Sequence, residues 1–238
     1  MEKLQLYNDW VDRVMTWCQD VGPRINRHVA AMQSRPFFDK KAEICFLGIN
    51  PAEDGSFNAE DLDYYRQRFF DGNSITPETW GDAGRGGHRK WNWIFNPEQA
   101  ENSFAKCGRG EAVKEGNYLF FNAIFFGSPH GGTDIRYQDI INKSVQFTAE
   151  AIVDVFIPKC VICFSIPKVW DRLNAELHFA KTSRMDILHP DGTPVSQRIM
   201  RGESKGIVFY GIPHPSAAFG LSKLDFDAII AAIHNDIK

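Results

Sequence analysis

Four short apolar runs constrain the fold of this chain more than any other feature of the sequence. They lie within residues 41–47, 117–125, 160–164 and 207–210. Stretches with helical spacing of apolar residues separate or follow them, at 61–70, 140–156, 169–179 and 222–237. Short, fully apolar strands that alternate with helices predict a parallel sheet covered on both faces. We therefore expect an α/β fold of three layers, α/β/α, around a central, mainly parallel sheet of four strands.

The length and composition are typical of one soluble globular domain. The chain has 238 residues, 43% hydrophobic and 24% charged, without an obvious internal repeat, so we expect a single domain over residues 1–238. Five cysteines, an odd count, favour reduced thiols, and neither a signal-peptide pattern nor a membrane span is found. We therefore expect a cytoplasmic protein without a membrane partner. The net charge of −3 excludes a global basic field, although a local phosphate-contacting face needs only a few placed cations.

The N-terminal residues 1–40 precede the first expected strand and show helical spacing. An amphipathic helix is expected over Leu6–Val21, and Pro23 is expected to break it. A second helix is expected over Arg24–Gln33.

Two further segments interrupt the alternation of helices and strands. Residues 181–205 contain the turn signal Asp191-Gly192-Thr193-Pro194 and are expected to form a hairpin or an extended insertion. Residues 71–87 have no clear period and are expected to form a long loop, which in a compact domain is often functional.

Two asparagines follow or end expected strands. Gly48 permits a sharp turn and Pro51 prevents further pairing, so Asn50 is left at the end of the first strand. Asn50 either serves turn chemistry or faces a ligand. Asn122 lies within the apolar run of the second strand, and a buried amide must be hydrogen-bonded. It therefore either braces a neighbouring loop or binds a ligand.

A histidine follows the last expected strand in the same way. His214 stands between Pro213 and Pro215, which stiffen the backbone around it, so it either caps a loop or presents a fixed ring to a ligand. In parallel sheets, ligands bind beyond the carboxyl ends of the strands. The sequence therefore predicts that Asn50, Asn122 and His214 converge on one pocket.

The segment His88-Arg89-Lys90-Trp91-Asn92-Trp93 mixes cations with aromatic residues. Arg89 and Lys90 either contact phosphates beside stacked bases or belong to a partly buried helix start. Cys160 and Cys163 have metal-like spacing, but residues three apart in a strand point to opposite faces, and no second pair follows. We expect neither a metal nor a cofactor.

With these stretches in view, the chain resembles the uracil-DNA glycosylase superfamily. The resemblance spans residues 44 to 220 and rests on four ordered motifs: Gly48-Ile49-Asn50-Pro51, Leu119-Phe120-Phe121-Asn122, Val161-Ile162-Cys163-Phe164-Ser165 and His214-Pro215-Ser216. The first motif is closest to the Gly-x-Asn-Pro of the mismatch-specific and single-strand-selective branches, where other members carry Asp. The resemblance implies a uracil-DNA glycosylase-like fold.

The resemblance also implies roles for the residues of the motifs. Asn50 positions the attacking water, and His214 donates a hydrogen bond to the uracil oxygen that gains charge. Asn122 binds the Watson–Crick edge of a base that has been flipped out of the helix, beside Gly48 and Ile49. Ser216 contacts a phosphate.

Two departures from the family pattern bear on the substrate. Ala52 stands where a bulky Tyr checks the 5-methyl group of thymine, and Ala217-Ala218 stand where an apolar wedge fills the gap left by a flipped base. Phe219 is the nearest residue that could replace the wedge. Alanine is too short to fill that gap and offset the cost of flipping a base from a stable duplex, so single-stranded or mispaired DNA is the expected partner.

Three functions follow from these observations. The first is a monofunctional DNA glycosylase of base excision repair that hydrolyses the N-glycosidic bond of uracil or a related base. The second is a non-catalytic module of the same fold that binds a nucleobase, nucleotide or nucleic acid. The third is a nucleotide-directed enzyme outside DNA repair.

Overall fold

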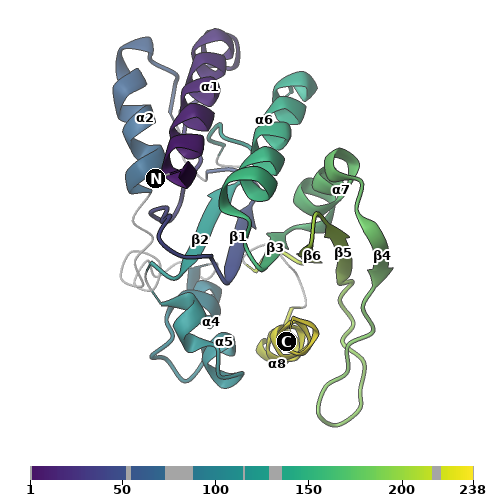
Figure 1. Ribbon diagram of the computed structural model, residues 1–238. Coiled ribbons are helices and arrows are strands. Elements are labelled where there is room, and N and C mark those ends of the chain that lie inside the picture. Colours follow the sequence, from purple (N-terminus) through teal and green to yellow (C-terminus); the bar gives the residue numbers. More distant parts are fainter. Residues whose placement is uncertain are drawn as a thin grey trace.

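The computed structural model describes residues 2–51, 55–72, 88–114, 116–128, 136–215 and 221–237, except for the side chains of residues 88 and 89. A six-stranded sheet in the order β2-β1-β3-β6-β5-β4 crosses the centre of the molecule (Figure 1). The strands are β1 (Ile44–Gly48), β2 (Tyr118–Asn122), β3 (Cys160–Phe164), β4 (Ala180–Arg184), β5 (Met200–Ser204) and β6 (Ile207–Ile212).

The first four strands in this order, β2-β1-β3-β6, are parallel, as the apolar runs predict. The prediction of four strands in total is wrong, because β5 and β4 extend the sheet in antiparallel pairing beyond β6. The two added strands form the hairpin expected of residues 181–205. Every residue of β4 is exposed, so this polar edge strand carries no apolar run that the sequence could reveal.

Helices cover both faces of the sheet and complete the three layers (Figure 1). One face carries α1 (Glu2–Ile25), α2 (Leu62–Asp71), α6 (Gln138–Glu150) and α7 (Asp171–Leu177). The other face carries α4 (Asn92–Phe95), α5 (Ser103–Lys106) and α8 (Lys223–Asp236). Short segments η1 (Ala59–Asp61), η2 (His88–Trp91), η3 (Gly110–Val113), η4 (Ala151–Phe156) and η5 (Ile166–Trp170) join them.

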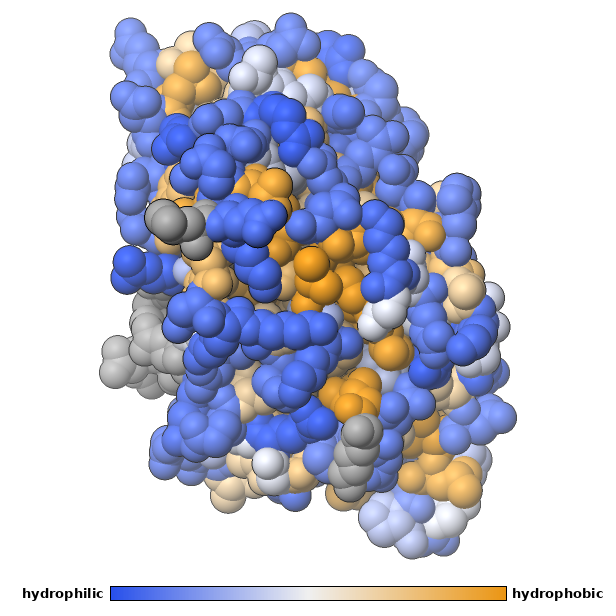
Figure 2. All heavy atoms as spheres, viewed as in Figure 1, coloured by the Kyte–Doolittle hydropathy of each residue, from blue (hydrophilic) through white to orange (hydrophobic). Residues whose placement is uncertain are grey.

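Alternate residues of the parallel strands enter two separate cores. Cys45 and Leu47 of β1 point into the core beneath α1 and α6, whereas Ile44 and Phe46 point into the core above α8. Figure 2 shows that hydrophilic side chains cover most of the viewed surface, with apolar ones gathered in small groups. The apolar side chains of the strands are therefore used inside the molecule, on both faces of the sheet.

The N-terminal region differs from the expected pair of helices. Helix α1 continues through Pro23 and ends at Ile25, after which Asn26 takes a left-handed conformation with φ 48°. Residues 28–34 are not helical and run along β2 and the segment after it, with hydrogen bonds such as Ala30 N to Phe125 O (2.8 Å) and Gln33 N to Phe120 O (2.7 Å). The second predicted helix is wrong, because β2 is an edge strand whose free backbone groups pair with this segment.

The closing helix α8 begins where the sequence predicts. Ser222 caps it, and a reciprocal hydrogen bond with Asp225 completes a capping box. Among the helices of the described ranges, none is both long and apolar enough to cross a membrane.

Candidate functional site

The segments that leave β1 and β2 run side by side beyond the carboxyl ends of the strands. Gly48 lies opposite Asn122 in the parallel register. Three backbone hydrogen bonds continue the pairing: Ala123 N to Gly48 O (3.0 Å), Ile124 N to Ile49 O (2.9 Å) and Ser128 N to Pro51 O (2.9 Å). This pairing fixes the backbone on which Asn50 lies.

The Asn50 amide is held by three carbonyl oxygens. Its Nδ2 lies 2.9 Å from Pro51 O, 3.2 Å from Ser128 O and 3.5 Å from Phe126 O, which share its two N–H hydrogens, and the residue is 9% exposed. Carbonyl oxygens only accept hydrogen bonds, so the end of the amide that faces them must be the NH₂ group. Among the described residues, no donor reaches Asn50 Oδ1. The amide braces its loop, as turn chemistry predicts, and its oxygen is directed away from that brace.

The Asn122 side chain lies directly against Gly48. Its Oδ1 is 2.4 Å from the position that a Cβ on Gly48 would occupy. Its Nδ2 donates to Ala31 O over 3.4 Å, and the residue is 3% exposed. The nitrogen end therefore faces Ala31 and the oxygen end faces Gly48. Gly48 is the last residue of β1 and has no positive φ, so it is needed for the close approach of Asn122 and not for the expected sharp turn.

Substituting Gly48 by alanine is expected to displace the Asn122 amide, because a real Cβ cannot lie 2.4 Å from Oδ1. Overpacking of this kind costs about 1–3 kcal/mol in the free energy of unfolding, which chemical denaturation would measure. The double variant Gly48→Ala/Asn122→Ala removes the clash and should recover most of that loss. Equal stability of Gly48→Ala and the wild type would contradict the tight contact.

His214 lies beyond the end of β6, between two aromatic rings. The Trp91 ring centroid is 5.5 Å away at an interplanar angle of 88°, and that of Phe164 is 6.1 Å away at 72°. Burial, assisted by the positive charge of Lys168, lowers the pKa of His214 to about 4. The imidazole is therefore neutral at pH 7 and carries one N–H donor and one acceptor nitrogen.

Asn122 and His214 are on the same face of the sheet. Asn122 continues the row of Tyr118 and Phe120, which enter the core above α8, and His214 contacts Phe164 of the same core. The strand order β2-β1-β3-β6 places them at the two ends of the parallel part of the sheet, with Asn50 between them along that order. All three residues therefore lie at the carboxyl edge of the sheet. That Asn50 and His214 face a common cleft stays a prediction.

The other predicted site residues have different positions. Ile49 packs its side chain against the core beneath α1, so only its backbone is at the strand edge. Lys90 donates to Leu221 O (3.2 Å) and lies 5.5 Å from the Trp93 ring, as expected for the cation of a partly buried helix start. Its contact with a phosphate stays a prediction. The Arg89 side chain, Ser216, Phe219, Ala52, Ala217-Ala218 and residues 73–87 lie outside the described parts of the chain.

Ser165 lies just after β3 and belongs to the third of the four sequence motifs, but no role was predicted for it. Ser165 has φ 106°, which is unusual for a residue with a side chain. Its N–H donates to Ile212 O (2.9 Å), and its hydroxyl accepts from Lys168 N (3.4 Å). A signal was present, because Pro167 follows β3 closely, as Pro51 and Pro215 follow β1 and β6. A search after every expected strand for a polar residue close to a proline would therefore find Ser165.

The predicted separation of the two strand cysteines is confirmed. Cys160 belongs to the core above α8 and Cys163 to the core beneath α1, so they point to opposite faces of β3. Burial raises the pKa of both thiols, that of Cys160 to about 12, which leaves them unreactive.

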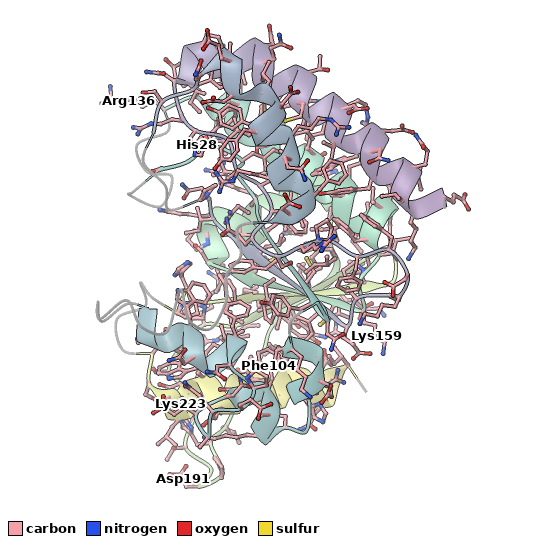
Figure 3. All side chains as sticks on the ribbon, turned by 90° about the vertical axis from the view of Figure 1, so that its left-hand side faces the viewer. His28, Phe104, Arg136, Lys159, Asp191 and Lys223 are labelled. Carbon is pink, nitrogen blue, oxygen red and sulfur yellow. The ribbon has the colours of Figure 1, made fainter. Side chains whose placement is uncertain are left out.

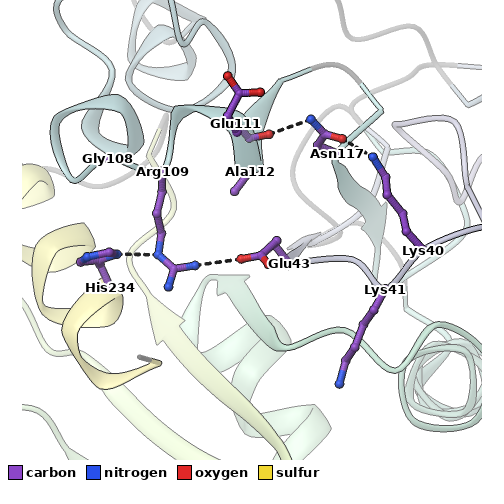
Figure 4. Close-up of a pocket in the computed structure, with 9 residues that line it drawn as sticks. All are labelled: Lys40, Lys41, Glu43, Gly108, Arg109, Glu111, Ala112, Asn117 and His234. Atoms are coloured by element: carbon purple, nitrogen blue, oxygen red, sulfur yellow. Dashed lines mark hydrogen bonds and ion pairs between the residues drawn. The ribbon is translucent and has the colours of Figure 1, made fainter.

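A polar cavity of about 480 Å³ lies at the opposite, amino end of the strands (Figure 4). There Arg109 bonds to His234 and to Glu43 (3.0 Å), and Lys40 bonds to Asn117. In Figure 3, Lys159, which precedes β3, marks the amino end of the strands, and His28 lies toward their carboxyl end. Several wall groups of the cavity are paired with one another, and the two bonds of Arg109 tie α8 to the residue before β1.

Comparison of the chain with protein-family models gives no match, and comparison with curated proteins gives none either. The assignment of a function therefore depends on the residues at the carboxyl edge of the sheet.

Proposed function

We propose that this protein is a DNA glycosylase of the uracil-DNA glycosylase type, which hydrolyses the N-glycosidic bond of uracil or a related base. The observation that carries the proposal is the Asn50 amide, whose nitrogen is bound by three carbonyls at the carboxyl edge of a parallel sheet. Such an amide can present its oxygen to a water molecule in a fixed direction. The parallel order β2-β1-β3-β6 between two helical layers supports a fold of this type.

The chemistry follows from what these side chains can and cannot do. The bond between C1′ of the sugar and N1 of uracil breaks, its electron pair leaves with the base, a water oxygen adds to C1′, and the proton that this water loses ends on the released base. An amide takes up no proton near neutral pH, so Asn50 orients the water and does not activate it as a base. The glycosidic bond must then be largely broken before the water attacks C1′. The charge that develops on the base is met by the N–H of neutral His214, a preorganised donor of the kind that contributes a few kcal/mol.

Recognition of the base is assigned to Asn122. Uracil has an acceptor at O4 and a donor at N3, and one amide matches both groups. The hydrogen bond to Ala31 O and the contact with Gly48 favour a single orientation of the amide, which discrimination against cytosine requires.

One observation favours the second candidate, a non-catalytic binding module. Asn50 and Asn122 are both nearly buried and both hydrogen-bond to backbone carbonyls, which a purely structural role also requires. The two candidates agree on the ligand and differ in whether a bond is broken.

Incubation with uracil-containing oligonucleotides, followed by hot alkali, separates these candidates. The glycosylase should produce alkali-labile sites in a uracil-containing single strand and none in a thymine-containing one. Because flipping from a stable duplex costs a few kcal/mol, scission should be faster in single strands and U·G mispairs than in U·A pairs. Tight binding without scission would favour the binding module. Equal rates of scission in single strands and in fully paired duplex would contradict the expected preference for single-stranded or mispaired DNA.

A further inference from the structure

Trp91 connects the predicted site residue His214 to the rest of the carboxyl edge. It is the last residue of η2 and is 4% exposed. Besides His214, its ring packs edge-on against Phe164, with centroids 5.3 Å apart at 76°. Since Phe164 also contacts His214 (6.1 Å), the imidazole lies in a corner formed by two buried rings from different elements.

The Trp91 ring is itself fixed from behind. It stacks on Phe95 of α4 (5.6 Å, 28°) and contacts Phe120 of β2 (5.9 Å), and those two rings stack on each other (5.3 Å, 13°). Phe120 is two residues before Asn122 on the same face of β2. One rigid aromatic cluster therefore joins the strand that carries Asn122 to the loop that carries His214.

The two prolines beside His214 restrict its backbone but leave rotation about χ1 and χ2 open. Ring contacts with fixed neighbours restrict those rotations and keep water from that side of the imidazole. We propose that Trp91 is a positioning residue, which holds the His214 ring in one orientation and shields it from solvent. The clamp is a property of the fold, and only its consequence for base release depends on the proposed function.

A positive charge acts on this corner from η5. Lys168 of η5 is the cation whose field reaches His214, and it favours the neutral imidazole. Lys90, next to Trp91 in the chain, directs its amine to Leu221 O. Removal of Trp91 would let water approach His214, and the pKa of about 4 should then rise toward the ordinary value of His.

The test compares Trp91→Leu with Trp93→Leu. Trp93 is also buried in the core above α8, but it packs on Phe226 and has no ring contact with His214 among the described residues. Both changes should lower the melting temperature. NMR titration of His214, assigned by loss of its signal in His214→Gln, should show its pKa raised by about one pH unit or more in Trp91→Leu. It should be unchanged in Trp93→Leu.

Trp91→Phe retains an aromatic ring and should keep most of the clamp. On a uracil-containing single strand, Trp91→Leu should lower kcat about 10-fold or more with little change in KM, as expected when an interaction made in the transition state is lost. An unchanged His214 titration in a folded Trp91→Leu protein would overturn the proposal. The NMR measurement decides this even if the wild type releases no base, so it is independent of the proposed function.

Discussion

Replacing Asn50 by alanine is expected to lower the rate constant of uracil release by about 10³-fold, within the range for loss of a group that positions a reactant for proton transfer or attack. The physical reason is that alanine removes the amide oxygen, whose direction is set by the carbonyl contacts of Nδ2. Affinity for a uracil-containing strand should change little, because in the proposed reaction Asn50 contacts the water and not the base. Single-turnover cleavage and fluorescence anisotropy measure the two quantities on the same oligonucleotide.

The variant Asn50→Asp provides a matched control of nearly the same shape. An ionised carboxylate has only acceptors, and in this fold it would face the carbonyls of Pro51, Phe126 and Ser128. Asp stands at the matching position in the classical branch of the superfamily that the chain resembles, but here we expect Asp to destabilise the loop by about 1–3 kcal/mol. Thermal unfolding would measure this. Full activity of Asn50→Ala would remove the residue from the site, and an undiminished melting temperature of Asn50→Asp would contradict the three-carbonyl brace.

Replacing Asn122 by aspartate is expected to abolish the preference for uracil. The carboxylate would face the Ala31 carbonyl and would meet uracil O4 without a donor, which leaves like partial charges opposed. An unmatched buried polar group costs on the order of 1–3 kcal/mol, equivalent to a loss of about 5- to 150-fold in binding. Residual preference should shift toward bases with an exocyclic amine, such as cytosine.

Melting temperature and relative binding of uracil and cytosine, measured together, distinguish recognition from bracing. If Asn122 only anchors the segment that contains Ala31, its substitution lowers stability and leaves base preference unchanged. An unaltered preference in a folded Asn122→Asp protein would therefore exclude Asn122 from base recognition.

The parallel part of the fold could be predicted because each of its strands is marked by its own short stretch of apolar residues. Runs such as Cys160–Phe164 are apolar on both faces, and only a strand covered by helices on both sides uses such a run. The sequence predicts a hairpin over residues 181–205 but not that it extends the sheet, because the exposed sequence Ala-Lys-Thr-Ser-Arg of β4 has no strand pattern. Strand β4 forms because β5 offers it a free edge.

The path of residues 28–34 shows the limit of local propensity. The segment has helical spacing, but β2 is the edge strand on its side, and Phe120 and Phe125 offer carbonyls that a helix here would leave unpaired. Tertiary hydrogen bonding outweighs a helix preference worth only tenths of a kcal/mol per residue.

The candidate site was predictable in its residues and not in its geometry. A proline just beyond an apolar strand marks Asn50 and His214 in the sequence alone. Two of the three carbonyls that orient Asn50 belong to Phe126 and Ser128, which are 76 and 78 residues away along the chain. The sequence places Trp91 in a segment of cations and aromatic residues, but its contact with His214 depends on how η2 packs against the sheet.

The most direct test of the glycosylase assignment is the quantity of free uracil released from a uracil-containing single strand, measured by mass spectrometry beside the number of abasic sites formed. The wild type should release one uracil for each abasic site, and Asn50→Ala should do so about 10³-fold more slowly. A wild-type protein that binds the strand tightly and releases no uracil would contradict the glycosylase assignment.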